Sequence, residues 1–203
     1  MRYLPVATED RFEELQDGRV DLMCGATTMT LSRRSLVDFS LPTFATGATL
    51  LYRKDGPQSF EQLEGQKVGV RAGTTTEAGL QAVLDAHQFE AELVPMPSHE
   101  EGLKQLVTGN LAAYFGDGAI LLYQWRSSPD RDKLMISTRF FSNEPYGLAL
   151  ARDDGSFRLA VDRALARLYR SGQIIDLFHA TFGSDAEPSD LVKALYTLNA
   201  LPE

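Results

Sequence analysis

The sequence has 203 residues, of which 43% are hydrophobic and 24% charged, so it can form one large domain or two smaller ones. Its longest apolar runs have the length of strands, which argues against a transmembrane helix. The formal net charge is −8 and basic residues are interspersed with acidic ones, which argues against a nucleic-acid partner because phosphate binding needs a basic patch.

The first fifty residues combine short elements. Met1–Pro5 lacks the charged and then apolar segment of a signal peptide, which taken literally predicts a cytoplasmic protein, or else a natural start elsewhere. Thr8 is placed to cap a helix over residues 9–16, and residues 20–24 read as a strand. The single cysteine, Cys24, excludes an internal disulfide and is expected to pack at the strand end, with a reactive thiol as the alternative.

The middle of the chain has the clearest alternation of strands and helices. Strands are predicted over residues 48–52, 67–71, 91–94 and 111–115. Ser98 and Glu101 form a capping box at the start of a helix that ends at Gly109. Asp117 heads a further helix. A strand over residues 146–151 then precedes a long amphipathic helix and a last helix over residues 174–182. This order predicts mainly parallel sheets with helices on both faces.

The segment Gly73–Glu77 is the most informative local feature. It follows a predicted strand and opens a helix with three threonines. Backbone N–H groups at a helix start, together with hydroxyls, can bind a carboxylate or a phosphate. Simple capping of the helix by one threonine is the alternative. No Gly-Lys-Ser/Thr follows, so the segment is not a Walker loop.

Three charged or titratable residues also follow predicted strands or begin helices. Arg33 comes after a strand and a run of hydroxyl residues, where an arginine can bind a carboxylate or simply face solvent. Asp117 can receive an ammonium group or cap its helix. His99 lies behind the Ser98 cap, and a solvated histidine is the alternative there.

Common catalytic and metal-binding signatures are absent from the sequence. It contains no GxSxG, HExxH or GxGxxG pattern. The histidines are far apart, so we expect no metal site and no cofactor. Hydroxyls, an arginine and a carboxylate at strand ends indicate ligand capture rather than bond making.

These features together resemble the type-2 periplasmic solute-binding proteins of amino-acid ABC importers, the bacterial extracellular solute-binding family 3. The resemblance covers nearly the whole chain in order. It rests on residues 18–22, 27–30, 33, 37–40, 65–70, 73–77, 117, 146–149 and 172. It implies a two-lobe α/β fold of type II with a ligand cleft between the lobes. Lobe one would comprise residues 1–45 and 146–203, and lobe two residues 46–145.

Within that family the chain looks most similar to the glutamate/aspartate-binding branch. The resemblance places Thr28, Arg33 and Thr74, with Thr75, on the α-carboxylate of the ligand. It places Asp117 on the α-ammonium group. Arg11, Thr8 and His99 would face the side-chain carboxylate. The sequence departs from the branch at Ala26, where a serine is usual, and at Gly116 and Gly118, where larger neighbours are usual.

The resemblance also implies a function and partners. The chain would bind a small, acidic amino acid in the periplasm and deliver it to the permease of an ABC importer. Family members have a strand, a helix and a second strand before the segment that matches Met1–Arg11. We therefore expect an incomplete first lobe: either the start is truncated, or another chain fills the gap, as in a dimer, or binding is impaired. The alternatives are a dehydratase-like enzyme, with Glu77 or Glu144 as the acid, and the ligand-sensing module of a signalling receptor.

Overall fold

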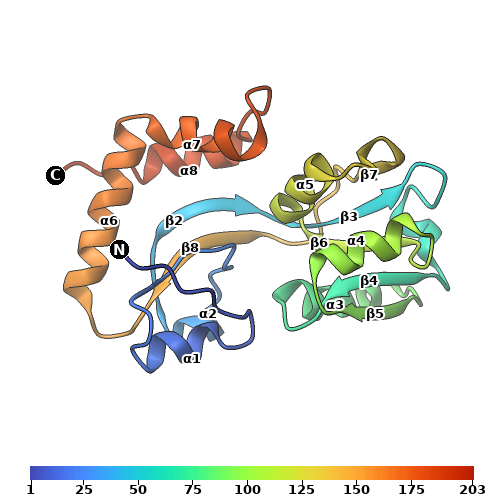
Figure 1. Ribbon diagram of the computed structural model, residues 1–203, viewed down its shortest axis with the longest axis horizontal. Helices are drawn as coiled ribbons and strands as arrows, with labels where there is room; N and C mark the ends of the chain where they lie inside the picture. Colours follow the sequence, from blue (N-terminus) through green and yellow to red (C-terminus); the bar gives the residue numbers. More distant parts are fainter. The chain divides into compact units, whose positions relative to one another are not determined.

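The computed structural model describes residues 1–203, which fold as two compact units. Unit 1 combines Met1–Ala45 with Pro145–Glu203, and unit 2 is the continuous segment Thr46–Glu144. The chain therefore passes between the units twice, within the strands labelled β2 and β8 (Figure 1). Each helix is too short or too polar to cross a membrane.

Unit 2 is built on a five-stranded sheet with the order β5-β4-β6-β3-β7. The strands are β3 (Ala48–Arg53), β4 (Lys67–Arg71), β5 (Glu92–Met96), β6 (Ala113–Asp117) and β7 (Leu134–Ile136). The helices are α3 (Thr75–His87), α4 (His99–Val107) and α5 (Gly118–Ser127), with short 3-10 turns at Phe60–Leu63 and Arg131–Lys133.

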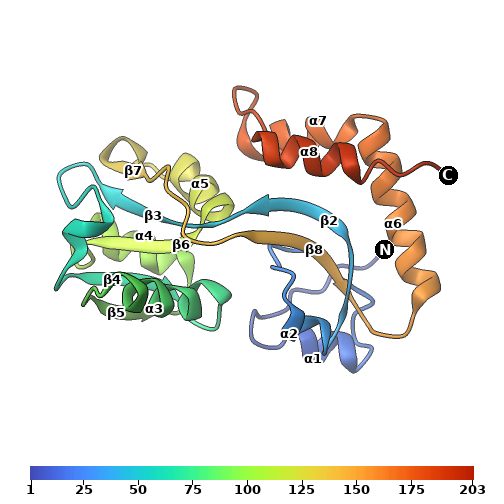
Figure 2. The same cartoon turned by 180° about the vertical axis from the view of Figure 1, so that it is seen from behind.

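The two faces of this sheet carry separate hydrophobic cores, as the period of two along a strand requires. Leu50 and Phe115 face the core that contains Leu80 of α3. Their neighbours Leu51 and Tyr114 face the opposite core, which contains residues of α4 and α5. Opposite views show α3 on one face of the sheet and α4 on the other (Figures 1 and 2). The sheet is thus covered on both faces, as predicted.

Unit 1 has a three-stranded sheet with the order β1-β8-β2. The strands are β1 (Leu22–Met23), β2 (Asp38–Thr46) and β8 (Glu144–Leu150). The helices are α1 (Arg11–Gln16), α2 (Leu31–Arg34), α6 (Gly155–Arg170), α7 (Gln173–Phe182) and α8 (Asp190–Leu198). One core gathers α1 and the sheet around Leu15 and Phe39, and another packs Tyr169 of α6 against Tyr196 of α8.

Three expectations about local structure are corrected. The predicted Thr8 cap is wrong, because α1 begins only at Arg11 with Asp10 in the N-cap position. The fully buried Leu15 holds this short helix against the sheet. Cys24 is exposed rather than packed. Sheet pairing is mixed rather than mainly parallel.

The reason for mixed pairing lies in the connections of unit 2. β4 pairs in parallel with β5 and β6, which helices α3 and α4 connect. β3, which enters directly from unit 1, runs antiparallel to both β6 and β7.

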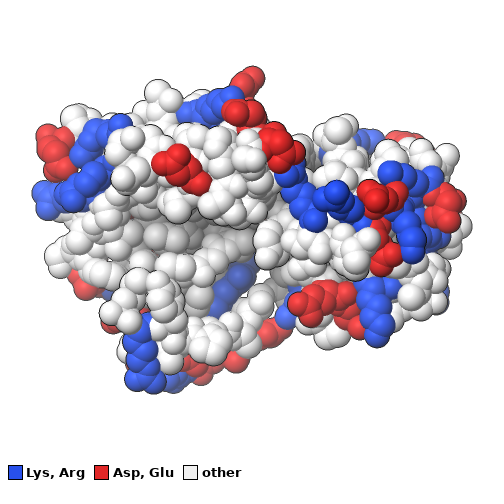
Figure 3. Space-filling view, turned by 45° about the horizontal axis from the view of Figure 1, so that its top comes forward, with Lys and Arg blue, Asp and Glu red and all other residues white.

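On the face drawn in Figure 3, basic and acidic side chains are interspersed.

Candidate functional site

In unit 2 the candidate residues gather at one edge of the sheet. β4 and β6 are parallel neighbours, with Val70 opposite Phe115, so their carboxyl ends lie at the same edge. Thr74 follows the end of β4, and Asp117 is the last residue of β6. Ligands of open α/β sheets bind at this kind of edge. The structure thus brings together two residues that lie 43 positions apart in the sequence.

Thr74 is the N-cap of α3. Its hydroxyl accepts a hydrogen bond from the Glu77 backbone N–H at 3.2 Å and donates one to the Arg71 carbonyl at 2.8 Å. The Glu77 carboxylate in turn accepts from the Gly73 N–H at 2.8 Å, one residue before the cap, whereas a capping box would use the N–H of Thr74 itself. The Thr74 hydroxyl therefore serves to cap α3. The groups of α3 that can bind a carboxylate are the backbone N–H groups of its first turn.

Thr75 connects α3 to a buried carboxylate. Its hydroxyl lies 3.1 Å from Glu144 Oε2, and the Ser142 hydroxyl donates to Glu144 Oε1 at 3.0 Å. Glu144 is only 4% exposed and is the last residue of unit 2. The two hydroxyls hold the carboxylate as a hydrogen-bond acceptor and fix the start of α3 beside it. Sequence reasoning had considered Glu144 only as an acid.

Asp117 is 6% exposed and caps α5. Its Oδ1 accepts hydrogen bonds from the backbone N–H groups of Ala119 at 3.0 Å and Ile120 at 3.3 Å. The flanking glycines, an unexpected departure in the sequence, have a steric cause. A Cβ at Gly118 would lie 3.0 Å from the Gly47 carbonyl oxygen, and one at Gly116 would lie 2.9 Å from Leu121.

His99 is the first residue of α4, and Ser98 caps that helix as predicted. Its Nδ1 lies 3.0 Å from the Tyr114 hydroxyl. Burial and, next, the charge of Arg71 lower the pKa of His99. His99 is therefore half-buried, with one ring nitrogen facing the buried Tyr114 hydroxyl.

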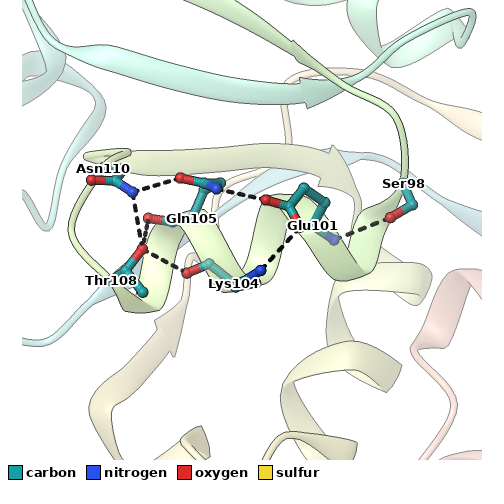
Figure 4. A network of polar contacts seen from close by, with 6 residues as sticks. All are labelled: Ser98, Glu101, Lys104, Gln105, Thr108 and Asn110. Carbon is teal, nitrogen blue, oxygen red and sulfur yellow. Dashed lines mark hydrogen bonds and ion pairs between the residues drawn. The ribbon is translucent and has the colours of Figure 1, made fainter.

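A chain of polar contacts runs along α4 from Ser98 to Asn110 (Figure 4). Gln105 donates to Glu101 at 2.6 Å and accepts from Asn110 at 2.6 Å. Lys104 lies 3.7 Å from the Glu101 carboxylate. These contacts tie both ends of the helix that carries His99.

Unit 1 brings two arginines to one aromatic ring. The Cζ atoms of Arg11 and Arg33 lie 4.9 Å and 5.5 Å from the centroid of the Phe12 ring. Burial, followed by the charge of Arg33, lowers the pKa of Arg11 to about 10, against an opposing effect of Glu9. The two guanidinium groups repel each other electrostatically. An anion bound between them would relieve that repulsion and be stabilised by both charges.

Thr28 lies beside this pair of arginines. Its carbonyl oxygen accepts a hydrogen bond from Arg33 Nη1 at 2.8 Å, and its backbone forms a bridge to Tyr146. Thr28 is buried and Arg33 is half-buried, and the hydrogen bond to Thr28 holds the guanidinium against the protein. Thr8 lies in the turn before α1 and is half-buried.

Sequence reasoning passed over Arg71 and Tyr114. Both residues lie inside predicted strands, over residues 67–71 and 111–115, and nothing in their neighbours singled them out. Their proximity to His99 depends on strand register and on the packing of α4, which local patterns do not encode. The chain holds no group of three or more His, Cys, Asp or Glu side chains that could bind a metal ion.

Comparison with known proteins gives consistent findings. The family model described as bacterial extracellular solute-binding proteins, family 3, matches residues 1–184. The L-glutamate/L-aspartate-binding protein of Pseudomonas aeruginosa is 30% identical over 192 residues, which are 94% of this chain and 64% of that protein. This chain thus spans a little under two thirds of that relative.

Two solved structures are also similar. The GluR0 ligand-binding core from Nostoc punctiforme in complex with L-glutamate has a TM-score of 0.71 and 27% identity, over 84% of this chain and 77% of that one. An ancestral amino acid-binding protein, a precursor of cyclohexadienyl dehydratase, has a TM-score of 0.78 and 26% identity, over 89% of this chain and 77% of that one. The predicted type II fold is confirmed.

Proposed function

Because the chain belongs to the bacterial extracellular solute-binding proteins, family 3, we propose that it binds a small amino acid with groups of both units. An acidic amino acid such as glutamate or aspartate is the ligand we expect. The relative from Pseudomonas aeruginosa carries those two ligands in its name. In this proposal the chain works outside the cytoplasmic membrane and delivers its ligand to the permease of an ABC importer.

The complementary charge of the two units is the observation that carries this proposal. Unit 1 supplies the paired cations Arg11 and Arg33 around Phe12. Unit 2 supplies the buried carboxylate of Asp117 and the N-terminus of α3. A zwitterion needs both kinds of group, so each unit alone satisfies only part of the ligand. Binding would then favour the conformation in which both units contact it.

Arg33 and Thr28 would take the α-carboxylate together with the first turn of α3 at Thr74 and Thr75. Asp117 would take the α-ammonium group through the carboxylate that also caps α5. Arg11, Thr8 and His99 would face the second carboxylate of an acidic ligand. Arginine suits this task because its guanidinium can donate two parallel hydrogen bonds to a carboxylate.

A dehydratase-like activity is the competing possibility, since one similar structure is a precursor of such an enzyme. Glu77 and Glu144 were the candidate acids. Glu77 accepts a hydrogen bond from the Gly73 N–H, and Glu144 accepts hydrogen bonds from Thr75 and Ser142. Those contacts suit structural acceptors better than a proton donor to a substrate. The two functions differ in outcome, because an enzyme would turn over a prephenate-like compound and a binding protein would retain one ligand per chain.

We also propose that two copies of the chain pair through the open edge of the sheet in unit 1. β1 is the edge strand of its sheet and pairs over only two residues, with β8. An open strand edge can accept another strand. Sedimentation velocity should show a dimer, and a monomer at all concentrations would contradict this part of the proposal.

A thermal-shift screen of the twenty amino acids tests the proposed function. A ligand that binds only the folded chain stabilises it by about 2.7 kcal/mol when present at about 100 times its dissociation constant. We expect L-glutamate and L-aspartate to raise the melting temperature most, with D-glutamate as the control. A screen in which no amino acid raises it would overturn the proposal.

A further inference from the structure

Arg71 is a positively charged residue of unit 2 to which the ligand contacts proposed above assign no role. It ends β4 and is half-buried, and its Nη1 donates a hydrogen bond to the carbonyl of Ala72 at 2.9 Å. Burial lowers the pKa of His99 and the charge of Arg71 lowers it further, whereas at Tyr114 burial raises the pKa and the charge of Arg71 opposes that rise. Arg71 pairs with Met96 of β5, three residues before His99. It lies two residues after Gly69 and therefore on the same face of β4, where the Cβ position of Gly69 is 2.9 Å from the Tyr114 ring. β4, α4 and β6 thus bring Arg71, His99 and Tyr114 together beside the carboxyl ends of β4 and β6.

Two glycines make the space that this convergence requires. The Tyr114 ring is 1% exposed and lies between β4 and α4. A Cβ at Gly102 of α4 would lie 2.6 Å from Tyr114 Cζ, and one at Gly69 of β4 would lie 2.9 Å from Tyr114 Cδ2. Any larger residue at either position would displace the ring and, with it, the hydroxyl that meets His99. The contact is thus built into the fold.

The protonation of this pair follows from its surroundings. Burial raises the pKa of Tyr114, so its hydroxyl keeps its proton at neutral pH. Burial lowers the pKa of His99, so its imidazole is neutral there. A protonated tyrosine can donate to Nδ1 of a neutral imidazole, which leaves the imidazole proton on Nε2. His99 would then offer a ligand one neutral N–H donor, and Arg71 would be the adjacent positive charge.

We propose that Arg71 and His99 form a subsite for the side-chain carboxylate of an acidic amino acid, in which Arg71 selects the charge of the ligand. Tyr114 is a positioning residue that orients His99. This inference rests on the proposed function and deepens it, because it names the group in unit 2 that separates glutamate from glutamine. Both ligands can accept the His99 hydrogen bond, but only a carboxylate gains from the Arg71 charge.

Calorimetric titration of L-glutamate and L-glutamine into four forms of the full chain tests the subsite. The forms are the parent, Arg71→Met, Arg71→Lys and the control Lys67→Met. Lys67 begins the same strand, is exposed and lies 3.6 Å from Glu92, so its loss removes a cation from the opposite end of β4. Arg71→Met removes both the charge and the guanidinium group, whereas Arg71→Lys keeps the charge and removes only the planar geometry of the guanidinium.

We expect Arg71→Met to weaken the binding of L-glutamate by about 10- to 100-fold and the binding of L-glutamine by less than about threefold. Arg71→Lys should fall between Arg71→Met and the parent, and Lys67→Met should bind both ligands as the parent does. Equal weakening of the two ligands, or no change, would overturn the subsite while leaving amino-acid binding in place. A parent that binds no amino acid at all would overturn the proposed function as well.

The positioning role of Tyr114 has a spectroscopic test. Long-range proton–nitrogen NMR of the imidazole in the parent should show the proton of His99 on Nε2. Tyr114→Phe, which keeps the ring and removes the hydroxyl, should give a mixture of the two tautomers. A parent with its proton on Nδ1, or a Tyr114→Phe variant with an unchanged spectrum, would contradict this role.

Discussion

The glycine in the middle of α4 gives the sharpest test of the packing beneath His99. In a helix interior, alanine is normally favoured over glycine by about 0.5–1 kcal/mol. Gly102→Ala should reverse that sign, because its Cβ would lie 2.6 Å from Cζ of a Tyr114 ring that is 1% exposed. Carbon atoms pack at about 3.5–4.0 Å, so either the buried ring or α4 has to move.

Overpacking of this kind costs about 1–3 kcal/mol. Set against the gain in helix propensity, Gly102→Ala should lower the free energy of unfolding by about 1–2 kcal/mol. Gly79→Ala is the matched control, since Gly79 also lies in a helix interior, in α3 of the same unit, and nothing lies within 4 Å of its Cβ position. That variant should be more stable than the parent by about 0.5–1 kcal/mol.

Urea unfolding followed by tryptophan fluorescence measures both variants. The chain has one tryptophan, Trp125 of α5, whose indole N–H donates to the carbonyls of Arg131 and Leu134. It therefore reports on unit 2. With a denaturant dependence of about 1–3 kcal/mol per molar urea, the two midpoints should shift in opposite directions by several tenths of a molar. If Gly102→Ala is as stabilising as Gly79→Ala, the Tyr114 ring does not lie against α4 and the His99 contact fails with it.

Two further predictions concern residues of unit 2. Thr74→Ala removes the cap of α3 and should cost about 1 kcal/mol in the same unfolding assay; no loss would contradict the capping role. The lowered pKa of His99 means that the unfolded chain takes up this proton first as the pH falls below about 6.5. The parent should therefore lose stability relative to His99→Gln between about pH 7.5 and about pH 5.5, and parallel stability curves would contradict this.

Local signals were enough to predict several helix starts. Ser98 caps α4 and Asp117 caps α5 because each side chain reaches backbone N–H groups two or three residues ahead, which a sequence displays directly. The start of α1 was misplaced because Asp10 occupies the N-cap position without a side-chain cap. There the helix is stabilised by the packing of Leu15 against the core, and such packing cannot be inferred from the neighbouring residues in the sequence.

Contacts between elements that are distant in the sequence could not be predicted for the same reason. The site of His99 requires β4 and β6 to pair in one register, with Gly69 opposite Tyr114, and α4 to approach through Gly102. Shifting the register by one residue would turn Tyr114 to the opposite face. The antiparallel course of β3 likewise follows from its entry out of unit 1, whereas alternation of strands and helices alone indicated parallel pairing.

Calorimetric titration of L-glutamate into the parent, Arg33→Gln and Asp117→Asn tests the central claim most directly. Asparagine is also a good N-cap, so Asp117→Asn removes the charge and keeps the start of α5. We predict one bound glutamate per parent chain and a loss of at least about tenfold in affinity, about 1.4 kcal/mol, for each variant. If either variant binds L-glutamate as tightly as the parent, the two units do not share the ligand in the way proposed here.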